Sequence, residues 1–367
     1  MRERFFELDF IRAVAILCVL LAHAWCARFP GGAVDGSRAA GAMLVSLLFF
    51  QGCTGLFVLV SGALILPKER REGFPLLWRR VLGFVLLAGV WSVVTNACAY
   101  VADGWQVLAA LAQSVRYHSL IVGGWAYRAG HLWFLSLIVS LYLAAPFLAR
   151  LAYAMPRRAY LLFAGISCLL YPLPGTLDVG WQGRSFLDPD TMVTFGGYDV
   201  FGVFASWFLL GHLFWSVDVR ALAERYTRHY CVWLLVLLAA VLGAGGAMEL
   251  CLTGGRSIYA PLHLFRPSLP IFFLAPLLFL LLKEMAPWFG RRRWRVWVTR
   301  LARHSFGMYL SHVALLWLLL PFLERHGLGP ARGSLLPVGL AFAVLLAGSW
   351  GLTALLFRWR WLRWLVH

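Results

Sequence analysis

The chain has 367 residues, of which 61% are hydrophobic and only 13% charged, and its mean hydropathy is +0.76. The hydrophobic core of a soluble chain of this length cannot bury that much apolar surface. The apolar stretches also recur at about 17–25 residues, the length that crosses the hydrocarbon region of a bilayer. The composition therefore excludes a soluble globular protein and predicts an all-α, polytopic membrane protein.

We predict about ten transmembrane helices within one membrane domain, 1–367. The first apolar segment is expected to be a retained helix, because no small-residue cleavage site follows it. The interrupted apolar stretch 105–120 is expected to lie along the outer interface or to fold back over the bundle. The expected spans are, in chain order, 8–26, 43–66, 78–101, 132–153, 159–173, 198–216, 230–250, 263–283, 305–323 and 335–357.

The formal net charge of +17 is unevenly distributed along the chain. Of the 33 Lys and Arg residues, 23 fall in alternate loops and at the two ends. The positive-inside rule then predicts that both termini are cytoplasmic, as an even number of spans requires. The excess of basic over acidic residues thus reflects membrane topology and attraction to anionic lipid headgroups rather than nucleic-acid binding.

Seven cysteines lie in or beside the predicted spans without the spacing of metal ligands. They are expected to pack as small apolar residues, and we predict no metal site. A disulfide bond on the outer side, from Cys26 to Cys98 or from Cys26 to Cys251, is an alternative that the sequence leaves undecided.

The first span, "LDFIRAVAILCVLLAHAW", carries Asp9, Arg12 and His23. At about 100° per residue, Arg12 and His23 differ by about 20° in direction and Asp9 lies about 40° from His23, so all three share one stripe. Ionisable residues within spans commonly face the bundle interior and mark a substrate or ion path. The alternative is interfacial anchoring of Asp9 and Arg12, with His23 as a polar packing residue.

Three later spans add polar groups. Ser61 and Gly62 interrupt the apolar second span, where a small pair usually indicates close helix packing and a serine nucleophile is less expected. His131 and Trp133 open the fourth span; Trp133 alone would fit an interfacial aromatic belt. The ninth span carries Ser305, Tyr309, Ser311 and His312. Each residue alone also fits helix packing, but together they place three histidines and an arginine in one bundle.

Four stretches then match a family pattern in order: "ELDFIRAVAILCVLLAHAW", "LFFQGCTGLFVLVSGALI", "GHLWFLSLIVSLYLAAP" and "SFGMYLSHVALL". The first resembles the opening helix of the acyltransferase-3 family of integral membrane acyltransferases, an Arg or Lys followed after ten intervening residues by His. The third is similar to the "HLWFLxxLxxxYLxxP" of its polysaccharide O-acetyltransferase branch. The matches run from residue 7 to about 316.

The resemblance implies a ten-helix core that uses a cytoplasmic acyl-CoA, usually acetyl-CoA, as co-substrate with no bound cofactor. It also implies that Arg12 and His23 are the essential pair. Family members often carry "RRxxRxxP" after the second span. Here Arg79 and Arg80 match its beginning, but Gly83 replaces the later Arg and no Pro follows.

From these residues we expect an O-acetyltransferase of the bacterial plasma (inner) membrane that modifies a hydroxyl of a cell-surface sugar or lipid-linked glycan. His23 would be the general base; Arg12, Arg79 and Arg80 would bind the donor. His131, Trp133, Tyr309 and His312 would shape the acceptor side, and Ser61 would be an acyl carrier only in a covalent mechanism. The alternative is a transporter or flippase for a lipid-linked sugar or acyl group, against which the chain shows no internal repeat. A non-catalytic scaffold leaves the Arg12–His23 stripe unexplained.

Overall fold

The computed structural model describes residues 5–28, 52–72, 74–118, 128–170, 172–173, 176, 203–253, 268–326 and 336–366, and all regular elements in these ranges are helices. The elements are α1 (Phe6–Arg28), α3 (Cys53–Glu72), α4 (Phe74–Ala102), α5 (Val107–His118), η2 (Gly130–Leu132), α6 (Trp133–Ala154), α7 (Arg157–Leu170), α9 (Ala205–Ser216), α10 (Val219–Ala223), α11 (Tyr230–Thr253), α12 (Leu269–Phe289), α13 (Arg292–Arg325), α14 (Leu336–Arg358) and η5 (Arg363–Leu365).

In the described ranges, seven helical segments are long and apolar enough to cross a membrane. They lie in α1, α4, η2 together with α6, α11, α12, α13 and α14. The apolar part of α3, Cys53–Pro67, is shorter. The predicted fifth and sixth spans correspond to the short helices α7 and α9, and both predictions extend beyond the described residues. The all-α membrane class is therefore confirmed, while ten spans stays a prediction.

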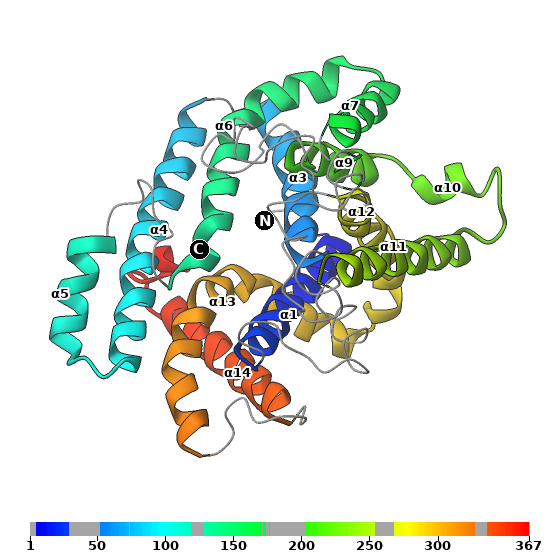
Figure 1. The fold of residues 1–367 in the computed structure, drawn as a ribbon. Coiled ribbons are helices and arrows are strands. Elements are labelled where there is room, and N and C mark those ends of the chain that lie inside the picture. The colour runs from blue at the N-terminus through cyan, green and yellow to red at the C-terminus, as the bar shows by residue number, and fades with distance from the viewer. Residues whose placement is uncertain are drawn as a thin grey trace.

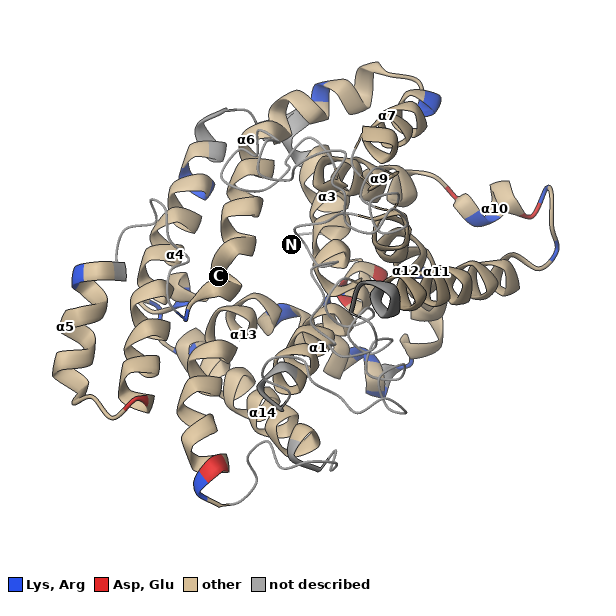
Figure 2. Cartoon of the chain, viewed as in Figure 1, with Lys and Arg blue, Asp and Glu red and all other residues tan. Residues whose placement is uncertain are grey.

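Large apolar side chains cover the outward faces of the bundle. Phe147, Leu161, Leu162, Val232 and Trp233 are all at least half exposed on α6, α7 and α11. A soluble monomer rarely exposes so much contiguous apolar surface. Figure 2 shows most charged residues near helix ends and in connections. This distribution is that of a multi-pass membrane protein, whose outward faces contact lipid.

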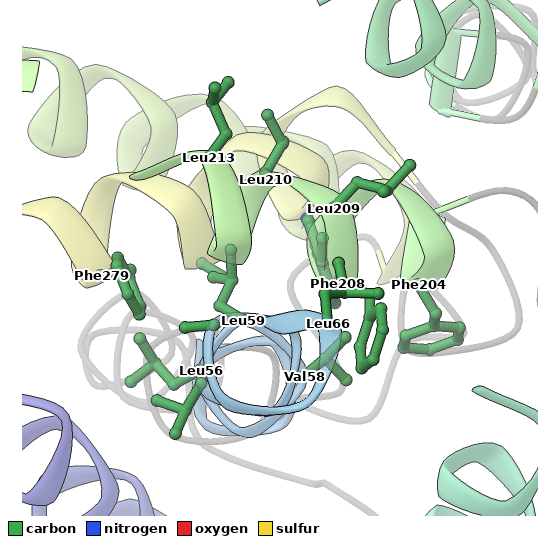
Figure 3. Packing of buried hydrophobic residues seen from close by; sticks show 14 of the residues in the cluster. Leu56, Val58, Leu59, Leu66, Phe204, Phe208, Leu209, Leu210, Leu213 and Phe279 are labelled. Carbon is green, nitrogen blue, oxygen red and sulfur yellow. The ribbon is translucent and has the colours of Figure 1, made fainter. Parts of the chain in front are cut away.

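Close packing of α3 against α9 forms one half of the core. In Figure 3, Leu59 of α3 points toward α9, and Leu66 of α3 lies beside Phe208 of α9. The two helices approach so closely because a glycine stands on each side of the contact. A Cβ at Gly62 would lie 1.8 Å from the backbone oxygen of Phe208, and one at Gly211 would lie 2.0 Å from that of Leu59. The close helix packing predicted at Gly62 is thus what the structure shows.

The other half of the core surrounds α13, which packs against α1, α4 and α14. Figure 1 shows α13 as a bent helix beside α1 and α14, and α5 folded back along α4. The predicted ninth span, 305–323, begins too late, because the Arg- and Trp-rich residues before it already belong to the helix. Hydropathy marks the apolar part of a helix, whereas Arg has high helix propensity and lengthens it.

The segment after α14 packs against the face of α13 that carries Gly307. Val366 is buried against Gly307, and the Trp91 Nε1–H of α4 donates a hydrogen bond to the Leu365 oxygen at 2.8 Å. Cys98 in α4 is a free cysteine in the structure, and the side chains of Cys26 and Cys251 lie outside the described residues, so the bridges from Cys26 stay predictions. These contacts fix α13, whose opposite face carries the polar residues considered next.

Candidate active site

The first polar cluster joins α1 to α13 through Arg12. Its Nη2–H donates a hydrogen bond to Ser305 Oγ at 3.4 Å, and its Nη1 lies 4.0 Å from Asp9 Oδ1. The Arg12 side chain is 28% exposed, whereas Asp9 and Ser305 are buried. The guanidinium thus bridges α1 and α13 at this point of the bundle.

The second cluster consists of three histidines from distant parts of the chain. The ring centroids of His23 and His312 are 4.7 Å apart, and those of His131 and His312 are 5.2 Å apart. His131 comes from the short helix η2, which ends where α6 begins. The predicted acceptor-side residues His131 and His312 therefore lie beside the predicted base His23.

The two clusters occur in the same order on α1 and α13. Arg12 contacts Ser305, and eleven residues further along α1 His23 contacts His312 of α13. The two helices therefore run side by side in the same direction, as the first and ninth of ten spans would. Ser305 and His312 are seven residues apart, about two helical turns, and so share one face of α13. This common face connects an arginine end with a histidine end.

Aromatic side chains line the region between the two ends. Tyr309 lies 5.9 Å from both His131 and His312, ring centroid to ring centroid, and its hydroxyl donates a hydrogen bond to the His131 backbone oxygen. Phe134 of α6 lies 5.7 Å from Tyr309 by the same measure. Neither the position of Phe134 in this cluster nor a role for Ser305 was predicted from the sequence. The helical period could have indicated Ser305, since it shares its face with His312.

Trp133 and Ser61 lie to one side of this cluster. Trp133 has ring contacts with Phe134 and Phe204, which extend from η2 toward α9. Ser61 Oγ donates a hydrogen bond at 2.7 Å to the Phe57 oxygen in its own helix. Among the described residues, no hydrogen bond joins Ser61 to the histidines; the Phe57 ring, one helical turn before Ser61, lies 6.0 Å from the Phe134 ring, centroid to centroid.

Arg79 and Arg80 lie in the first turns of α4, Arg79 exposed and Arg80 half-buried. One helical turn further, the Phe84 ring lies 5.7 Å from Phe306, the neighbour of Ser305 in α13. Both arginines thus belong to the same end of the bundle as Arg12. Gly83, which replaces the basic residue of the family pattern, has open space around its Cβ position.

Backbone oxygens fix the orientation of the His312 and His131 rings. His312 Nδ1 lies 2.6 Å from the Tyr309 oxygen and His131 Nε2 lies 3.5 Å from the Leu310 oxygen. His312 Nε2 and His131 Nδ1 are buried and have no hydrogen-bond partner among the described residues. Within the described ranges, no group of three or more His, Cys, Asp or Glu residues is arranged to hold a metal ion.

The described residues form a helical bundle with lipid-facing apolar surfaces, and an internal stripe carries an arginine at one end and clustered imidazoles at the other; this arrangement defines a multi-pass membrane protein with polar groups in its interior. A family model described as an acyltransferase domain, that of the acyltransferase-3 family, matches residues 5–354. The chain therefore belongs to the acyltransferase-3 family and is an integral membrane acyltransferase. Comparison with curated proteins and with solved structures gives no match.

Proposed function

We propose that the chain transfers an acetyl group from cytoplasmic acetyl-CoA to a hydroxyl of a cell-surface sugar or lipid-linked glycan at a bacterial plasma membrane. The observation that carries the proposal is the common face of α1 and α13, which joins Arg12 and Ser305 to His23 and His312. In an acyltransferase, such a face offers a cation for the donor and an imidazole for the acceptor.

The reaction needs a base but no redox step. The acceptor oxygen attacks the thioester carbonyl while His23 takes the hydroxyl proton. The new C–O bond forms, the C–S bond breaks, and the CoA thiolate leaves with the proton that His23 gives back. Imidazole suits the base role because it accepts and releases protons near neutral pH. Hydrogen-bond donors near the carbonyl would stabilise the oxyanion that develops.

The arginine end is proposed to hold the donor. Arg12, Arg79 and Arg80 belong to one end of the bundle, and guanidinium groups bind phosphates through paired hydrogen bonds. Arg12 and His23 are separated by about 16 Å along α1, a distance that an extended pantetheine arm can cover. The stripe would then guide the thioester from the arginine end to the histidines.

The transporter alternative is less well supported, because the chain belongs to an acyltransferase family. A direct experiment separates the two functions. The chain, purified in lipid nanodiscs, is incubated with radiolabelled acetyl-CoA, and thioester loss is measured with and without membrane glycolipid extract. An acyltransferase consumes the thioester and labels the extract, whereas a transporter does neither. Mass spectrometry of envelope glycan from a deletion strain and its parent then identifies the acceptor.

The Arg12→Lys variant tests the donor site. Lysine keeps the charge but loses the planar fork, so we expect the KM for acetyl-CoA to rise about 10-fold with kcat little changed. Initial rates at varied acetyl-CoA concentration measure both constants. The matched control is Arg158→Lys, an exposed arginine of α7. Equal KM values in the two variants would contradict donor binding by Arg12.

Replacing Ser61 by alanine distinguishes direct transfer from a covalent mechanism. The Ser61 hydroxyl donates to the Phe57 oxygen within α3, as a packing serine does. We therefore expect Ser61→Ala to retain activity within about threefold, because only one ordinary hydrogen bond is lost. Mass spectrometry of the wild type after incubation with labelled acetyl-CoA provides the second measurement. An acetylated Ser61 peptide, together with an inactive variant, would establish the covalent route instead.

A further inference from the structure

Two nitrogen atoms in the histidine cluster have no partner. His131 Nδ1 and His312 Nε2 are both buried, and within the described part of the chain neither forms a hydrogen bond. The two residues are 7% and 0% exposed, and their ring centroids lie 5.2 Å apart. Buried polar atoms are nearly always paired, so two such atoms on adjacent rings need an explanation.

The chemical state of both atoms follows from their hydrogen bonds. A backbone carbonyl only accepts, so the nitrogen that faces it must carry the hydrogen. His312 therefore donates from Nδ1 to the Tyr309 oxygen, and His131 donates from Nε2 to the Leu310 oxygen. In a neutral imidazole the second nitrogen then has a free lone pair, and burial favours the neutral ring. The unpartnered atoms are thus two hydrogen-bond acceptors that lack donors.

We propose that His131 Nδ1 and His312 Nε2 form a subsite that accepts hydrogen bonds from two hydroxyls on adjacent carbons of the acyl acceptor. This inference rests on the proposed function and narrows its acceptor to a vicinal diol, as found on a sugar ring. Each hydrogen bond spans about 2.8 Å, so hydroxyls on neighbouring carbons can reach both rings. The third ring, His23, lies against His312 and would face one of these hydroxyls.

The same chemistry disfavours other occupants. A carboxylate or phosphate has no hydrogen to donate when ionised, and its charge would meet two lone pairs in a buried site. A molecule with one hydroxyl would leave one acceptor unpaired. The subsite thus selects ligands by the number of hydrogen-bond donors that they present. Each hydrogen bond that a ligand fails to form should weaken its binding about 3- to 10-fold.

The test uses trans-1,2-cyclohexanediol as the probe and its monomethyl ether and cyclohexanol as controls with one donor. The full chain is labelled with ¹⁵N-histidine, placed in nanodiscs and titrated while the ring nitrogens are followed by NMR. We expect the unprotonated nitrogens of His131 and His312 to shift together with the diol. The ether and the alcohol should bind about 3- to 10-fold more weakly. Identical responses to all three probes, or none to the diol, would overturn the subsite.

Matched variants show which nitrogen acts. Asparagine keeps an acceptor near Nδ1 and glutamine keeps one near Nε2. We expect His312→Gln and His131→Asn to keep the preference for the diol, whereas His312→Asn and His131→Gln lose it. Acetyl transfer is assayed separately on the same samples. A diol response without acetyl transfer would contradict the proposed function alone, and acetyl transfer without a diol response would overturn the subsite alone.

Discussion

Replacing His23 by alanine is expected to lower acetyl incorporation about 10²- to 10⁴-fold, the usual contribution of a general base. The expectation rests on the contact of the His23 ring with His312, at a centroid distance of 4.7 Å, and on the stripe that connects it to Arg12. Incorporation into envelope glycan is measured in cells that produce the variant at normal abundance. Wild-type incorporation would refute the base role.

A control and a second variant make this result specific. His229 is exposed in the turn just before α11, so His229→Ala should leave incorporation unchanged. His312→Asn removes the neighbouring lone pair while keeping an amide near Nδ1, and we expect it to weaken acceptor use with a smaller loss of kcat than His23→Ala. If His312→Asn instead abolishes kcat while His23→Ala leaves it intact, His312 is the base.

Helical periodicity was sufficient to predict the stripe on α1, because direction within one helix depends only on residue spacing. The contact between Arg12 and Ser305 and the meeting of His23 with His312 could not be predicted in this way. They depend on which helices become neighbours, and this is determined by side-chain packing between segments that lie almost 300 residues apart. The family resemblance supplied only the expectation that Arg12 and His23 act together.

His131 shows the same limit more sharply. The sequence around His131 fits two interpretations, a water-facing residue at the start of a span and a functional group. Its position depends on the turn η2, in which Tyr309 of α13 donates a hydrogen bond to the His131 oxygen. No local pattern in "RAGHLW" encodes that partner. The unpaired ring atoms of His131 and His312 are also invisible to sequence reasoning, since satisfaction of a polar group is a property of its surroundings.

The Gly62→Ala substitution is expected to destabilise the fold by about 3 kcal/mol or more, because overpacking is costly where the opposing atoms cannot move aside. The added Cβ would lie 1.8 Å from the Phe208 backbone oxygen, so α3 and α9 would have to separate. Gly165→Ala is the matched control, since nothing lies within 4 Å of its Cβ position in α7. Alanine there should be neutral or stabilise by about 0.5–1 kcal/mol. Thermal unfolding of both purified variants in one detergent provides the comparison, and equal unfolding temperatures would contradict the tight α3–α9 contact.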